Sequence, residues 1–215
     1  WPSWMASMSS SDAANSASSS RPGNDETTED VHYKFCILAL QAEGEIFPLL
    51  WNYCLGQEKN DLTLGKALLE KAFRLFGDSP FDHLLVDRGF LDGAWMAYLK
   101  QDHKVDTIIA LKENMQILED LIGLSRGEDV QWLKADPPRL HNHEIPERHL
   151  AGFSDLTTWD SYAAPLNACL VRDTYSDGVV YQGIVSTDRT LSCQKLHSLK
   201  RQRWEEEEGF MTLSR

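Results

Sequence analysis

The sequence predicts a mixed α/β fold, a sheet flanked by helices, because segments with strand and helix patterns alternate along the chain. Two apolar runs of strand length, residues 33–41 and 45–54, flank Gly44 and predict a β-hairpin. A helix, a strand, a second helix and another strand follow. The second half carries a further hairpin and then a long helix, so a β-rich region is expected before the last helix.

The first 30 residues are expected to lie outside this sheet. Residues 6–30 consist mainly of Ser, Ala, Asn, Thr, Asp and Glu. Such a composition buries too little apolar surface to offset the entropy that is lost on ordering. We therefore predict a disordered Ser-rich tail over residues 1–30, which adds no strand, and a folded domain over residues 31–215.

The first hairpin and the helix after it have clear local signals. Pro48 predicts a free edge or a bulge in the second strand, because proline cannot donate a hydrogen bond to a neighbouring strand. The helix is predicted from Asn60-Asp61, an N-cap, to Gly77, a C-terminal cap. Apolar residues recur at helical spacing between these caps, namely Leu64, Leu68, Leu69, Ala72, Phe73 and Phe76.

The middle of the chain continues the alternation. The run His83–Asp87 predicts a short buried strand that ends at Asp87, and a helical segment from Leu91 to Leu99 follows. Val105–Leu111 predicts the next strand. Asp87 is therefore expected at the carboxyl end of a strand.

The second half is predicted to be β-rich up to its last helix. Residues 125–149 show no regular period, whereas residues 166–172 and 179–187 flank Ser176-Asp177-Gly178 and predict a second hairpin. The segment Cys193–Leu213 has no Gly or Pro before Gly209 and predicts one helix.

Composition and charge narrow the classes of function. The 215-residue chain is 42% hydrophobic with a net charge of -12, which fits a globular protein and leaves nucleic-acid binding to a local basic patch. The longest apolar run, Phe35–Leu40, is far shorter than the roughly 18 residues that span a bilayer. The N-terminus lacks a secretory signal, so a cytoplasmic protein is expected. The four cysteines show no CxxC spacing and are expected to be buried thiols. Because the chain does not begin with Met, we expect a fragment of a longer reading frame.

Acidic residues dominate the candidates for chemistry. Asp87 ends a predicted strand, Asp92 follows one turn later, and residues 205–208 are four consecutive glutamates on the last helix. Carboxylates that a fold brings together bind a hard divalent cation such as Mg²⁺. The alternative is structural, with Asp residues that cap helices and glutamates on a solvated helix face.

Three segments resemble DDE-type transposases encoded by bacterial insertion sequences. LLVDRGFLDGAWMAYLKQDHKVDTIIALKENM, residues 84–115, is similar to the family's second-aspartate region, in which a strand ends in D-R-G-F/Y. HYKFCILALQAEGEIFPLLW resembles the strands that follow the first Asp, and QKLHSLKRQRWEEEEGFMTLSR resembles the signature helix with its Arg-Trp pair before a catalytic Glu. The resemblance implies an RNase H-like domain over residues 31–215, with a β-rich insertion at about 125–190.

The resemblance also implies a site for two Mg²⁺ or Mn²⁺ ions held by three carboxylates. Asp87 matches the second carboxylate, and the spacing from Arg203 favours Glu207 over Glu206 for the third. We expect Asp87 to approach this glutamate pair to within about 10 Å, because two ions about 4 Å apart must bridge them. The family places its first Asp on a strand before Tyr33, and the sequence shows no apolar strand there. Asp25 and Asp30 are the acidic candidates in that segment.

The implied partner is DNA at transposon ends, in a bacterial cytoplasm or nucleoid, with a homodimer as an expected assembly. Basic residues near the predicted site are candidates for phosphate contacts, namely Arg88, Lys112, Lys200, Arg201 and Arg203. Arg203 lies four positions before Glu207, so on a helix it shares a face with it and would orient a carboxylate or meet a phosphate. Two functions stay open: metal-dependent cleavage and strand transfer in DNA transposition, or a catalytically inactive, transposase-derived DNA-binding or interaction module.

Overall fold

The computed structural model describes residues 5–14, 32–42, 45–55, 60–137 and 146–213. Within these ranges one mixed sheet runs in the order β3-β2-β1-β4-β5-β9-β8-β7-β6. The strands are β1 (Met5–Ala14), β2 (His32–Ala42), β3 (Glu45–Leu55), β4 (His83–Val86), β5 (Asp106–Ala110), β6 (Leu133–Ala135), β7 (Glu147–Leu156), β8 (Leu166–Thr174) and β9 (Val179–Ser186). The predicted mixed α/β fold is confirmed.

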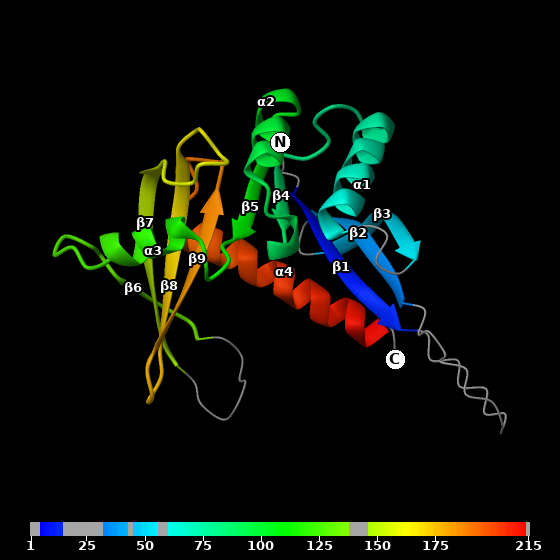
Figure 1. Cartoon of the computed structure of the whole chain (residues 1–215). Helices are drawn as coiled ribbons and strands as arrows, with labels where there is room; N and C mark the ends of the chain where they lie inside the picture. The colour runs from blue at the N-terminus through cyan, green and yellow to red at the C-terminus, as the bar shows by residue number, and fades with distance from the viewer. Residues whose placement is uncertain (1–4, 15–31, 43–44, 56–59, 138–145, 214–215) are drawn as a thin grey trace, which may run out of the picture.

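Helices cover both faces of this sheet (Figure 1). The helices are α1 (Asp61–Phe76), α2 (Gly93–Asp102), α3 (Gln116–Leu124) and α4 (Cys193–Leu213), with a 3₁₀ turn, η1 (Arg88–Phe90), after β4. Apolar residues of α1, α2 and α3 share one buried cluster with Val86 and Ile109, whereas α4 packs through Leu196 and Leu199 on Leu85 and Ile108 of the other face. Alternate residues of β4 and β5 thus serve the two layers, as the pleat of a strand requires.

The central strands bring the chain's chemistry to one edge. β4 pairs in parallel with both β1 and β5, and β5 pairs antiparallel with β9. The carboxyl ends of β4 and β5 therefore open at the same edge of the sheet, where Asp87 and Lys112 follow them. None of the helices in the described ranges is long and apolar enough to cross a membrane.

The prediction that residues 1–30 add no strand is wrong. Residues 5–14 form β1, which lies between β2 and β4 in the middle of the sheet. Ala6 and Met8 are completely buried in the cluster that also contains apolar residues of α1 and α2. These two apolar residues of an otherwise polar segment therefore supply its contact with the core. Backbone pairing on both sides stabilises a strand whose own composition does not predict one.

The predicted hairpins and helices are present. The register between β2 and β3 shifts next to Pro48, which pairs with Ala39, and β3 is also an edge strand, so both expectations for this proline are met. Asn60 caps α1, because its side chain accepts a hydrogen bond from Thr63 N–H, and Gly77 ends the helix with a positive φ of 96°. The second hairpin is β8–β9, and α4 is continuous from Cys193.

Candidate active site

Asp87 lies where β4 ends and the 3₁₀ turn η1 begins. Its backbone carbonyl accepts a hydrogen bond from Phe90 N–H at 2.9 Å, and its side chain makes no capping bond to that turn. Phe90 is completely buried, which fixes the turn against the core. The Asp87 side chain is 43% exposed. Because it makes no bond to its own turn, the orientation of its carboxylate depends on contacts with another element.

That element is α4. Arg203 Nη2 lies 3.2 Å from Asp87 Oδ1, and Lys200 Nζ lies 4.0 Å from the same oxygen. Only 2% of the Arg203 side chain is exposed, against 20% for Lys200. Of the two roles that the sequence suggested for Arg203, this burial favours orienting a carboxylate over meeting a DNA phosphate, because a phosphate on DNA needs an accessible donor.

The glutamates of α4 lie outside the residues whose side chains are described, which stop at Arg203. The helical backbone continues through them to Leu213. Glu207 is four positions after Arg203, so its backbone lies about 6 Å further along the helix axis, on the same face. The expected approach of Asp87 to Glu206 or Glu207 stays a prediction.

The register of β1 shows which of its residues lies beside Asp87. Met8 pairs with Val86, so the next residues, Ser9 and Asp87, follow at the same level of two adjacent parallel strands. Asp12 is the one acidic residue of β1, three positions beyond Ser9 and about 10 Å further along an extended strand, where it pairs with Lys34. The missing strand is thus present, but its sequence carries serine beside Asp87. Asp25 and Asp30 lie outside the described residues.

The remaining basic candidates divide between two places. Arg88 directly follows Asp87 and is exposed, and Lys112, also exposed, follows β5 at the same edge. Arg201 points elsewhere, because its guanidinium lies 3.9 Å from Asp136 beyond β6. The same edge of the sheet therefore carries Arg88 and Lys112, and Lys200 of α4 lies against Asp87 there.

A family model for the transposase DDE domain matches residues 51–215, more than half of the chain, from the second half of β3 through α4. The chain belongs to the transposase DDE domain family. DNA transposition through nuclease chemistry is the function of this family, whose domains act on DNA with divalent metal ions.

No curated protein matches this DDE domain. Among solved structures, it is similar to the NurA nuclease from Sulfolobus solfataricus, with 12% identity, a TM-score of 0.41, and coverage of 92% of this chain and 72% of that chain. A piggyBac transposase synaptic complex with hairpin DNA matches with 10% identity and a TM-score of 0.43, over 91% of this chain and 36% of that chain. The Ciona intestinalis Endonuclease V bound to DNA matches with 8% identity and a TM-score of 0.35, over 92% of this chain and 76% of that chain. The DDE domain thus spans about a third of the piggyBac chain.

A buried ion pair between β7 and β8 also contacts α4 in the DDE domain. Arg148 on β7 donates two hydrogen bonds to Asp173 on β8, of 2.7 and 2.6 Å, and its third nitrogen lies 3.3 Å from His197 Nε2 on α4. Burial lowers the pKa of His197, and the positive charges of Arg148 and Arg201 lower it further. A neutral imidazole therefore accepts the Arg148 hydrogen bond and holds the first half of α4 on the sheet.

A different acidic group lies at the opposite edge of the DDE domain. His83, Asp106 and Asp188 stand on three neighbouring strands or just after them, and their ligand atoms lie within 4.8 Å of one another. Sequence reasoning missed this group, because only the register of β4, β5 and β9 brings it together. Both oxygens of Asp106 accept hydrogen bonds from Lys100, of 2.6 and 2.7 Å, so a lysine ammonium already neutralises the carboxylate that a metal would need.

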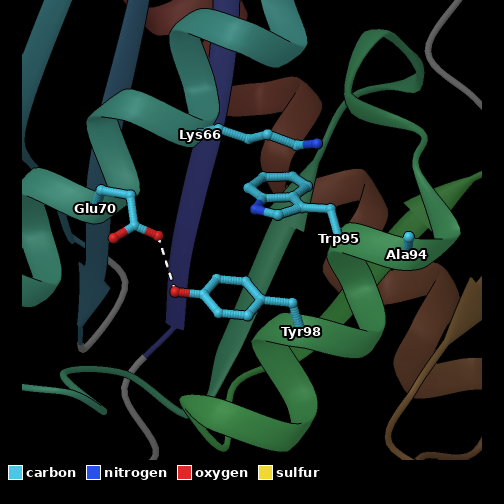
Figure 2. Close-up of a pocket in the computed structure, with 5 residues that line it drawn as sticks. All are labelled: Lys66, Glu70, Ala94, Trp95 and Tyr98. Atoms are coloured by element: carbon cyan, nitrogen blue, oxygen red, sulfur yellow. Dashed lines mark hydrogen bonds between the residues drawn. The ribbon is translucent and has the colours of Figure 1, made fainter.

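A surface hollow of about 330 Å³ lies between α1 and α2, away from Asp87. Figure 2 shows Tyr98 donating a hydrogen bond to Glu70, of 2.9 Å, and Lys66 above the Trp95 ring at 6.0 Å from its centre. Lys66 also bonds Asp92, the N-cap of α2, at 2.7 Å. Burial alone would raise the pKa of Asp92, but the Lys66 and Trp95 hydrogen bonds outweigh it and lower the pKa. These contacts join two helices, and the hollow has no part in the chemistry at Asp87.

Proposed function

We propose that this DDE domain binds the DNA ends in transposition at the carboxyl edge of β4 and β5, and that the chain as it stands does not cut DNA. One observation carries the proposal: α4 places Lys200 and Arg203 on Asp87, at the edge where Arg88 and Lys112 are exposed. The edge therefore offers donors for phosphate oxygens beside the oriented carboxylate of Asp87.

The residue that β1 places beside Asp87 argues against a complete two-ion site, whatever the α4 glutamates contribute. Such a site needs carboxylates that bridge the ions, and an ion loses binding energy when a ligand is missing. Of the described side chains at this edge, Asp87 supplies one carboxylate, and it is already paired with Arg203 and lies 4.0 Å from Lys200. Because β1 has serine at the level of Asp87, a first carboxylate directly beside Asp87 would be lacking, which supports an incomplete site.

The binding half of the proposal is tested with a fluorescently labelled duplex of mixed sequence, followed by anisotropy at several salt concentrations. The expected result is binding that weakens as salt rises, because each released counterion reports a phosphate contact. The net charge of -12 disfavours DNA elsewhere on the surface. Failure to bind at low salt would overturn the proposed function.

The cleavage half is tested on supercoiled plasmid with Mg²⁺ or Mn²⁺. The unmodified chain is expected to leave the plasmid intact, and Ser9→Asp, which puts a carboxylate beside Asp87, is expected to give metal-dependent nicking. Asp87→Asn on the Ser9→Asp background is the control and should abolish the nicking. If the unmodified chain nicks the plasmid and Asp87→Asn removes that nicking, the proposal that the chain does not cut DNA is wrong. In that case Asp12→Asn would show whether Asp12 supplies the first carboxylate.

A further inference from the structure

Two cysteines from distant parts of the sequence meet beneath the start of α4. Cys169 lies in the middle of β8, completely buried, and pairs with Gly152 on β7 and Ile184 on β9. Cys193 is the first residue of α4 and is partly exposed. Cys193 packs against the buried cluster that contains Cys169, and its thiol donates a hydrogen bond to Gln194 Oε1 at 3.3 Å.

Gly152 makes room for this contact. A Cβ built on Gly152 would lie 3.2 Å from Cys193 Cβ and 3.5 Å from its sulfur. Cys193 therefore lies directly over the Gly152–Cys169 pair of the β7–β8 ladder. Since folded elements hold Cys193 over the strand pair that contains Cys169, a bond between the two sulfurs needs little movement of the backbone.

We propose that Cys193 and Cys169 form an intrachain disulfide by exchange with a low-molecular-weight disulfide such as oxidised glutathione, and that this bond fastens the first turn of α4 to β8. The inference rests on the packing of Cys193 over the Gly152–Cys169 pair, and it is independent of the proposed function.

The two thiols differ in the way that such an exchange requires. The hydrogen bond from Cys169 and the backbone N–H groups of Gln194 and Cys193 lower the pKa of Cys193 to about 7, against the effect of burial. Hydrogen bonding to Cys193 and burial raise the pKa of Cys169. Cys193 is thus the attacking thiolate, which is accessible, and Cys169 is the second thiol, which is protected until Cys193 has reacted.

The exchange balances in two steps. The Cys193 thiolate attacks one sulfur of oxidised glutathione, which forms a mixed disulfide and releases one glutathione thiolate. Cys169 then loses its proton and attacks the Cys193 sulfur, which forms the Cys169–Cys193 bond and releases the second glutathione. The two thiols of the protein are oxidised, one glutathione disulfide is reduced to two thiols, and both protons end on glutathione.

The other two cysteines serve as internal references. Cys36 and Cys54 are both buried, and burial raises the pKa of Cys36 to about 12. Neither faces the other across β2 and β3, because Cys36 pairs with Asn52 and Cys54 with Lys34. They are expected to remain thiols under conditions that oxidise the Cys169–Cys193 pair.

The test incubates the folded chain with oxidised glutathione, quenches it with acid and maps its peptides without reduction. The expected product is a cross-linked Cys169–Cys193 peptide, a loss of two hydrogens in the intact mass, and a Tm roughly 5–10 °C above that of the reduced chain, because the bond closes a loop of about 25 residues. Cys169→Ala should stop at one glutathione on Cys193, and Cys193→Ser should acquire none.

Several results would overturn the proposal. A mixed disulfide that persists on Cys193 in the unmodified chain would show that Cys169 does not complete the exchange. A Cys193 thiol that stays free, or a bond that maps to Cys36 or Cys54, would show that the wrong pair was chosen. A cross-link that forms but lowers the Tm would show that it strains α4 instead of fastening it. Cys193→Ser changes a partly exposed residue, so it keeps the test valid even if Cys169→Ala fails to fold.

Discussion

Arg203 and Asp87 are joined by a hydrogen bond of 3.2 Å, although 116 positions separate them in the chain. Arg203 is the largest of the fully buried side chains, and its carboxylate partner stands at the end of the central strand β4. This contact fixes where α4 crosses the sheet. It therefore determines where the glutamate run that follows Arg203 on the same helix begins.

We expect Arg203→Ala to lower the free energy of unfolding by about 3 kcal/mol, because it leaves a cavity where a large side chain was buried. The measurement is urea unfolding followed by tryptophan fluorescence. Arg201→Ala is the matched control, since Arg201 lies on the same helix, 43% exposed and 3.9 Å from Asp136. It should change the unfolding free energy by less than about 0.5 kcal/mol. Equal losses in both variants would contradict the burial of Arg203.

Local patterns were sufficient for most elements of this fold. The α1 helix was predictable from its Asn60 cap, its apolar repeat and Gly77, and the β8–β9 hairpin from the turn at Ser176-Asp177-Gly178. These signals lie within a few residues of the structure that they specify. The family resemblance added the relation between Asp87 and the last helix, which spacing alone does not reveal.

β1 shows what such patterns miss. Its sequence, MASMSSSDAA, has neither an apolar alternation nor the β-branched residues of a typical strand. It is a strand because β2 and β4 pair with its two edges, a tertiary effect that composition does not contain. The group of His83, Asp106 and Asp188 was missed for the same reason, since strand register brings these residues together.

Glycine at the start of α2 is required by a close contact. A Cβ on Gly93 would lie 2.3 Å from the carbonyl oxygen of Ser161 and 2.9 Å from Tyr162 N. We expect Gly93→Ala to destabilise the protein by roughly 2–3 kcal/mol, because backbone atoms cannot yield as a flexible side chain does. Thermal unfolding measures the effect.

Gly123 in α3 is the matched control for Gly93. Nothing lies within 4 Å of a Cβ on Gly123, so Gly123→Ala adds only helix propensity. It should stabilise the protein by about 0.5–1 kcal/mol. A loss of stability in Gly123→Ala would show that α3 does not tolerate a side chain there.

His197 should make stability depend on pH in a narrow window. Its pKa in the folded protein lies below the ordinary value of 6.5, chiefly because of burial and then the charge of Arg148. The unfolded chain therefore binds a proton first as the pH falls, so stability is complete above about pH 6.5 and is lost progressively below it. Urea midpoints of the unmodified protein and His197→Gln between pH 5 and 8 measure this, and the variant should lack that part of the slope. A difference between the two that is independent of pH would contradict a neutral, buried imidazole.

One lysine lies next to each end of β5, and substituting each in turn tests whether DNA binds at the carboxyl edge of the sheet or responds to net charge alone. Lys112 follows the carboxyl end of β5, at the edge of Asp87 and Arg88, whereas Lys104 precedes the amino end, where its ammonium bonds the carbonyl of Gln101 at 2.6 Å. Lys112→Gln should weaken binding of the mixed-sequence duplex several-fold and reduce the slope of log Kd against log salt by about one, the expectation for one lost phosphate contact. Lys104→Gln removes the same charge next to the opposite end of β5, so it controls for the net charge and should leave both quantities unchanged. If the two variants weaken binding equally, the DNA responds to overall charge, and the carboxyl edge of β4 and β5 is not its binding site.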